Sequence, residues 1–210
     1  MNFINRANSS KLVLPGMVYS IFISINHNWD EEKPRVIVHS RHKHQFSLNV
    51  RAGIIEKFLI GDVLFLIGLT GTKYVDFLTT RLHEILEKVP VDIRLCTRCM
   101  HDEAPPHFSR VARQFLNQHF ANKWIGRGGP IAWPARSPDL NPLDFHLWGH
   151  LKSIVYATSI ENAEILRNRI EQGFRQIRET PGMIERVTGS MTRRVQACLQ
   201  MEGGHFGHLL

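Results

Sequence analysis

Apolar residues form three dense runs in the first third of the chain: Met17 to Ile25, Phe46 to Ile55 and Phe58 to Leu69. Each run is rich in Ile, Val, Leu and Phe and is bounded by Gly, Asn, Pro or charged residues, which is typical of β-strands. We therefore expect three strands here, with Gly53 and Gly61 marking turns between them.

The spacing becomes helical between Thr72 and Lys88. Thr72 suits the N-cap position, and Pro90 ends the helix. Apolar residues recur every three or four positions and form one stripe along the predicted helix: Tyr74, Phe77, Leu78, Leu82, Ile85 and Leu86.

Shorter elements alternate from there to residue 157. The pattern predicts a strand at Asp92–Met100, a helix at Phe108–Phe120 with Val111, Phe115 and Leu116 inward, a strand at Ile131–Trp133, and a helix at Leu143–Val155 that buries Trp148.

After Ser159 the pattern is purely helical, with helices at Asn162–Glu179 and Met183–Gln200. Strands first, then mixed elements, then helices predict an α/β fold: a mixed sheet flanked by helices. We expect a core at residues 1–157 and a C-terminal helical extension, residues 158–210, packed on that core.

The composition fits a folded domain with a polyanionic partner. Hydrophobic residues make up 43% of the 210 residues and charged residues 21%, which excludes a disordered tail or a fibrous protein. Lys and Arg number 26 against 19 Asp and Glu. Such an excess favours binding to DNA or RNA, because phosphate contacts supply most non-specific affinity; a generic solvated surface is the alternative.

Three cysteines, an odd and low number, do not make a disulfide framework, so a reducing compartment is expected. Cys96-x-x-Cys99, with His101 and His107 nearby, could form a zinc half-site. The simpler interpretation is two thiols on one strand.

The apolar stretch from Leu12 to Ile25 follows Arg6 and Lys11 and has the layout of a weak signal peptide. It contains Pro15, lacks a small-residue cleavage site and is too short to span a bilayer. We expect neither secretion nor a membrane partner.

Two clusters carry candidate chemistry. In His101–Phe108, Asp102 stands at the end of a predicted strand; in Ser137–Trp148, Asp144 stands at the start of a predicted helix. Carboxylates from a strand end and a helix start can converge on Mg²⁺, which prefers oxygen ligands, and paired ions of this kind cleave phosphodiesters. Taken singly, Asp102 could merely begin a turn, and Asp144 could merely favour a helix N-terminus.

Both clusters resemble mariner-type cut-and-paste DNA transposases. The second acid of that family lies in a pattern of the form His/Gln-Asp-Gly-Ala-Pro-x-His-Phe, which corresponds to His101–Phe108 here. The third lies in x-Asp-x-x-Leu-Trp after Ser-Pro-Asp-Leu-x-Pro, within Ser137–Trp148. The segment Trp124–Pro134 and the spacing of 41 residues between the two acids resemble an insect-type subgroup.

This resemblance, which runs from about Trp29 to Leu210, implies an RNase H-like core in which three acids hold divalent metal. It assigns Asp102 and Asp144 as catalytic and metal-binding residues, with Mg²⁺ or Mn²⁺ as cofactor if the protein is active and none otherwise. It also implies DNA as partner, bound non-specifically through a basic surface, and the nucleus as compartment.

The sequence departs from the family at the first acid, which belongs on the first core strand. Residues 1–29 contain no Asp or Glu, and the family's acid would fall close to Lys11. Asp30 is the earliest carboxylate. Glu103 replaces a usual Gly beside the second acid, and Arg51 replaces an aromatic residue in a predicted strand, where a buried, unpaired charge would be costly.

The family's N-terminal helix-turn-helix domain is also missing, so sequence-specific recognition is not expected. The leading hypothesis is a transposon-derived nucleic-acid-binding domain without full catalytic activity. The alternatives are an active metal-dependent endonuclease in which Asp30 or another acid replaces the lost one, and a non-catalytic interaction remnant whose C-terminal helices form a homodimer. The cations expected to meet phosphate flank the two acids: Arg110, Arg113, Lys123, Arg127, Arg136 and Lys152.

Overall fold

The computed structural model describes residues 17–21, 48–65, 69–101, 104–132 and 137–210. Five strands of these residues form one mixed sheet in the order β3-β2-β1-β4-β5. β1 is antiparallel to β2 and parallel to β4, and β5 continues the parallel side. The strands are β1 (Met17–Ile21), β2 (Asn49–Ile55), β3 (Phe58–Phe65), β4 (Arg98–Met100) and β5 (Trp124–Ile125).

The three predicted N-terminal strands are confirmed, but the turn between β2 and β3 is not where glycine predicted it. Ile55 pairs with Phe58, so Glu56 and Lys57 form the turn, with Glu56 at φ 50°. Gly53 and Gly61 lie inside strands. Gly61, at φ 102°, lies at a bulge in β3, where Asp62 is the extra residue opposite Arg51 and Ala52, and a Cβ on Gly61 would lie 2.7 Å from the Cα of Ala52. Close backbone approach, rather than a turn, explains this glycine.

Within the described ranges, six α-helices flank the sheet: α1 (Gly71–Leu86), α2 (Val91–Cys96), α3 (Arg110–His119), α4 (Trp148–Val155), α5 (Ala163–Glu179) and α6 (Met183–Gln200). The N-cap of α1 is Thr70, two residues before the expected Thr72, because the Thr70 hydroxyl accepts the Lys73 N–H at 3.3 Å. The predicted stripe of α1 is buried at Tyr74, Phe77, Leu78 and Leu82.

Two short predicted strands are confirmed only in part. Pro90 begins α2, where Asp92 suits the positive helix end, so the strand reduces to β4, and Cys96 and Cys99 do not share one strand. The other predicted strand makes only an isolated bridge between Ile131 and Ile125. Trp133 lies outside the described residues.

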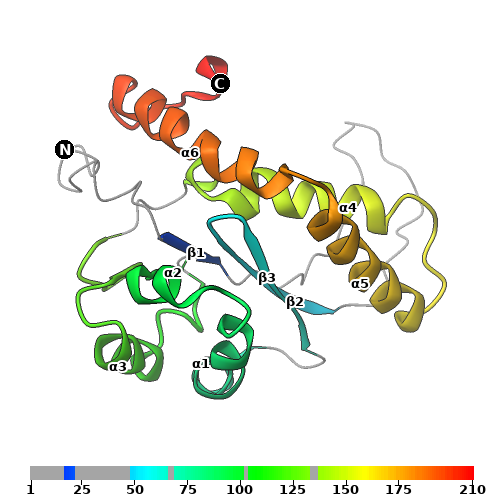
Figure 1. Ribbon diagram of the computed structural model, residues 1–210, viewed down its shortest axis with the longest axis horizontal. Coiled ribbons are helices and arrows are strands. Elements are labelled where there is room, and N and C mark those ends of the chain that lie inside the picture. Colours follow the sequence, from blue (N-terminus) through cyan, green and yellow to red (C-terminus); the bar gives the residue numbers. More distant parts are fainter. Residues whose placement is uncertain (1–16, 22–47, 66–68, 102–103, 133–136) are drawn as a thin grey trace, which may run out of the picture.

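Neighbouring residues of β4 and β5 face opposite layers, as the pleat of a strand requires. Cys99 and Trp124 pack with α1 and α3, whereas Met100 and Ile125 pack with α4, α5 and α6. Figure 1 shows α1 to α3 on one side of the sheet and α4 to α6 on the other. The mixed sheet flanked by helices is therefore confirmed.

Burial along the helices follows the predicted faces with one exception. Phe115 and Leu116 of α3 are buried as expected, but Val111 is 39% exposed, and Ala112 takes the inward position. The C-terminal helices bury their apolar faces against the same core as α4 and the sheet: Leu166, Ile170, Phe174 and Ile177 from α5, and Ile184, Met191 and Val195 from α6.

Arg51 is buried in β2, at 2% exposure. Its guanidinium lies 5.2 Å from the ring centre of Tyr74 and 4.8 Å from that of Phe77, both on α1. Burial lowers the pKa of Arg51 to about 10, and the interaction with Tyr74 opposes this shift. The aromatic faces stabilise a cation in an otherwise apolar layer.

Neither a metal cluster nor a membrane span is found in the part of the chain that the structure describes. No three His, Cys, Asp or Glu side chains gather there as metal ligands would, which gives the zinc half-site no support. Among the same residues, no helix is both long and apolar enough to cross a bilayer.

Candidate active-site region

Two parallel strands of the sheet end side by side at the candidate site. Tyr19 of β1 pairs with Met100 of β4, so the carboxyl ends of both strands meet at one edge of the sheet. Asp102 follows β4 by two residues, but it lies outside the described residues, as do Lys11, Asp30 and Glu103.

Asp144 lies in a wide helical turn, Leu143–Leu147, that leads directly into α4. A short 3₁₀ turn at Pro138–Leu140 places Asn141 just before it. Asn141 is almost fully buried, its side-chain oxygen accepts the Leu143 N–H at 3.1 Å, and its amide donates to the Asp144 carboxylate. The Ser-Pro-Asp-Leu-Asn-Pro segment thus fixes Asp144 at the helix start, as the sequence predicts.

Lys152 lies two turns further along α4, in electrostatic contact with Asp144. Burial lowers the pKa of Lys152, and the negative charge of Asp144 opposes that shift. Among the predicted cations that the structure describes, Lys152 is therefore the one that interacts with Asp144.

A cation that the sequence reasoning missed also lies here. The Arg194 guanidinium, from α6, lies 3.7 Å from the ring centre of Phe145 and donates to the carbonyl of Asp139 at 3.2 Å. Burial lowers the pKa of Arg194. No sequence signal links α6 to this turn, because Arg194 lies 49 positions after Phe145 in the sequence (194 − 145).

Buried rings flank the segment that carries Asp102. His101 and His107 are both fully buried, with ring centres 5.4 Å apart. His101 stacks on Trp124 at 5.3 Å, and His107 lies 4.5 Å from Tyr74 of α1. This cluster anchors both ends of the loop that contains the predicted second acid.

Two arginines that the sequence predicts to bind DNA both pack against the ring of Phe108. Arg113 of α3 and Arg127 of the following loop lie 4.6 and 4.2 Å from the ring centre of Phe108. Gly128 permits this packing at φ 75°, because a Cβ there would come within 3.1 Å of the Arg113 side chain. The structure thus brings together two cations that lie 14 positions apart in sequence (127 − 113).

The remaining predicted cations are dispersed. Arg110 is exposed at the start of α3, and Lys123 is exposed just before β5. Arg136 lies outside the described residues. Only Arg113 and Arg127, among the described cations that the sequence predicts, therefore form a compact pair.

Comparison with known proteins gives matches of two kinds. No family model matches the chain. A Caenorhabditis briggsae protein, the Transposable element Tcb1 transposase, is 31% identical over 87 residues, which cover 40% of this chain and 30% of the relative. The Transposable element Tc3 transposase of Caenorhabditis elegans is 42% identical over 60 residues, 29% of this chain and 16% of the relative. The aligned segments thus span less than a third of either relative.

Similarity to solved structures extends over nearly the whole chain. The catalytic domain of Mos1 mariner transposase matches with a TM-score of 0.70 at 16% identity, covering 98% of this chain and 95% of that chain. The Mos1 catalytic domain in a structure with Raltegravir and Mn gives 0.69 at 15% identity, covering 98% and 96%. A Mos1 paired end complex with Mg gives 0.64 at 18% identity, covering 98% and 63%.

These structures establish the fold, and the two sequence relatives point to the same group of proteins. The mixed sheet with helices on both faces agrees with the RNase H-like fold that the resemblance in the sequence implies. The chain therefore has the RNase H-like fold of the Mos1 catalytic domain, and over 40% and 29% of its length it is similar in sequence to the two transposases.

Proposed function

We propose that the chain is a transposase-derived nucleic-acid-binding domain that lacks full cleavage activity. The observation that carries this proposal is the sequence of β1, Met-Val-Tyr-Ser-Ile, in the centre of the sheet. The family resemblance requires an acid on the first core strand, and this strand provides none. Asp102 and Asp144 are then the two remaining acids of the expected three.

The residues present do not fit a complete divalent-metal centre. Mg²⁺ and Mn²⁺ require hard oxygen ligands, and a two-ion centre needs carboxylates that bridge both ions. β1 contributes no carboxylate, and Asp144 already interacts with Asn141 and Lys152. Asp102 and Asp144 would hold a single ion at most.

DNA binding is supported by charge and by the arrangement of Arg113 and Arg127. The chain carries a formal net charge of +7. Both guanidiniums lie against the Phe108 ring, which limits their side-chain freedom before phosphate arrives. Cations held in place in this way lose less entropy on binding a phosphate backbone than freely rotating ones.

Removing both arginines should weaken binding to duplex DNA about tenfold and reduce the slope of log K against log salt concentration by about 2, because two phosphate contacts are lost. Fluorescence anisotropy of Arg113→Ala/Arg127→Ala across a salt series measures both quantities. Arg175→Ala/Arg193→Ala, which removes two exposed cations from α5 and α6, is the control of equal charge. Wild-type affinity that is indifferent to salt, or equal losses in both variants, would contradict the proposal.

A competent endonuclease is the second candidate function, favoured by the fixed position of Asp144 at the start of α4. Supercoiled-plasmid nicking in Mg²⁺ or Mn²⁺ separates the two. We expect wild-type protein to nick no faster than Asp144→Asn, an isosteric change that removes only the charge. Nicking by wild type that Asp144→Asn and Asp102→Ala both abolish would establish an active centre, and Asp30→Asn would then test the replacement acid.

The structure gives less support to a dimerisation remnant. The apolar faces of α5 and α6 lie in the core of the same chain, so the predicted stripe is already covered. Light scattering at several protein concentrations would reveal a dimer that uses another surface.

We propose the nucleus as the compartment of this protein, because its proposed partner is DNA.

A further inference from the structure

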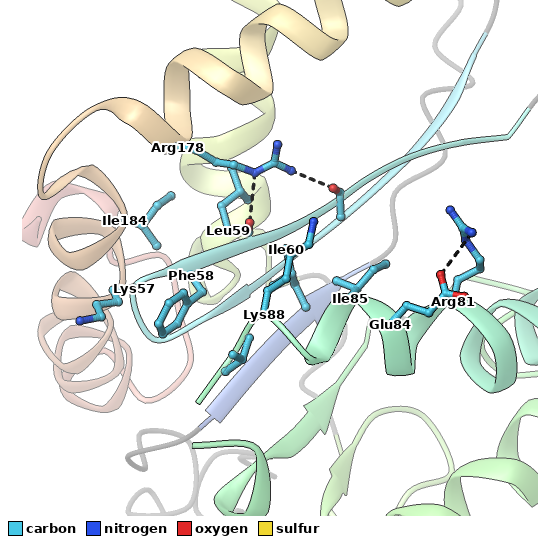
Figure 2. A pocket seen from close by; sticks show the side chains of 12 residues that line it. Lys57, Phe58, Leu59, Ile60, Arg81, Glu84, Ile85, Lys88, Arg178 and Ile184 are labelled. Atoms are coloured by element: carbon cyan, nitrogen blue, oxygen red, sulfur yellow. Dashed lines mark hydrogen bonds and ion pairs between the residues drawn. The ribbon is translucent and has the colours of Figure 1, made fainter. Parts of the chain in front are cut away.

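A cavity of about 570 Å³ lies between β3, the C-terminal half of α1, the end of α5 and the start of α6. Figure 2 shows side chains from these elements around a common space, with the β2–β3 turn at one end. The lining residues are Lys57, Phe58, Leu59, Ile60, Gly61, Arg81, Glu84, Ile85, Lys88, Val89, Arg178 and Ile184.

This cavity lies at the opposite end of the sheet from the candidate active site. Phe58 pairs with Ile55, and Ile55 pairs with Val18 near the start of β1. The candidate acids belong to the other end, where β1 and β4 terminate. The cavity is therefore a separate feature that the proposed DNA contacts do not use.

The cavity has an apolar base and a basic rim. Ile60, Val89 and Ile184 are 7%, 1% and 4% exposed and form part of the base. Lys57 and Lys88 are exposed at the rim, from the β2–β3 turn and the end of α1. The rim also holds Arg81, Glu84 and Arg178. Glu84 is the single acid of the lining and pairs with Arg81 at 3.2 Å, so the net charge around the cavity is positive.

Arg178 occupies the backbone acceptors on the outer side of β3. Its guanidinium donates to the carbonyls of Leu59 at 3.3 Å and Gly61 at 2.8 Å, along the side of β3 that faces away from β2 (Figure 2). An added strand would need those carbonyls. A ligand must therefore be recognised by side chains rather than by strand addition.

We propose that this cavity binds a short acidic segment of a partner protein that inserts one large apolar side chain. Carboxylates would meet Lys57 and Lys88, and the apolar side chain would displace water from the base at Ile60 and Val89. The size lies in the range of ligand pockets, about 300–1,000 Å³. A nucleobase fits less well, because Ile60, Val89 and Ile184 offer its donors and acceptors no hydrogen-bond partner. A DNA backbone would meet the rim and leave the base uncovered.

The probe for this site is a short fluorescein-labelled peptide of Asp and Glu with one central Phe, titrated with the full chain. We expect saturable binding that weakens about tenfold in Lys57→Glu/Lys88→Glu, because two attractive charge contacts become repulsive. Arg175→Glu/Arg193→Glu makes the same change in net charge away from the cavity and should retain most of the affinity.

A second peptide with Ser in place of the central Phe tests the apolar part of the site and should bind at least several-fold more weakly. Equal binding of both peptides, or equal losses in both charge-reversal variants, would reduce the effect to non-specific attraction and overturn the proposal. Displacement of the peptide by duplex DNA that persists in Arg113→Ala/Arg127→Ala would assign the cavity to nucleic acid instead. The DNA proposal is tested separately by that variant's own salt series.

Discussion

Phe174→Ala is expected to lower the free energy of unfolding by about 3–5 kcal/mol, because it removes a large ring from a closely packed core. Phe174 is fully buried on α5. Beside it, Gly173 allows close contact between α5 and α4, since a Cβ there would lie 2.6 Å from the Cδ1 of Leu151. Helices held this close cannot readily collapse into the space that the ring leaves.

Urea denaturation followed by circular dichroism measures this effect. Arg175→Ala, the next residue on the same helix but exposed, is the control for helix propensity and should change stability by less than about 0.5 kcal/mol. If Phe174→Ala proved as mild as Arg175→Ala, α5 would not be part of the core that the structure describes.

Trp124→Ala is expected to cost a similar amount, about 3–5 kcal/mol, and to disturb the flanks of the predicted second acid as well. Trp124 is fully buried in β5, donates its indole N–H to Asn117 at 2.9 Å and stacks on His101. Gly129 packs so closely that a Cβ there would lie 2.7 Å from the indole ring. Loss of the indole therefore removes support from His101 and from the loop after β5 together.

Trp124→Phe separates the two contributions, because it keeps a ring beside His101 and loses the hydrogen bond to Asn117. We expect it to retain most of the stability, with a loss of about 1–2 kcal/mol from the missing bond and the smaller ring. The measurement is again urea denaturation, with proton NMR of the His101 imidazole as a local readout. An unchanged His101 signal in Trp124→Ala would show that the stacking does not hold this segment.

The sequence alone determined the long elements and the resemblance to mariner-type transposases. Apolar residues of α1, α5 and α6 recur at helical spacing over several turns. Their apolar faces could therefore be predicted without knowing which elements they pack against. The two motifs that contain Asp102 and Asp144 could also be identified from the sequence. Around Asp144, Pro and Asn residues within a few positions fix the turn that precedes the helix. The absence of an acid before Trp29 is likewise a property of the sequence itself.

Only the tertiary structure decided the features that depend on distant partners. α2 was mistaken for part of a strand because a segment of six residues is too short for its period to distinguish a helix from a strand. Gly61 was assigned to a turn, although its role is close approach to the facing strand. The aromatic surroundings of Arg51, the shared ring beneath Arg113 and Arg127, and the basic cavity beside β3 each join side chains from different elements. Such contacts arise from packing of the whole chain, which local patterns do not encode.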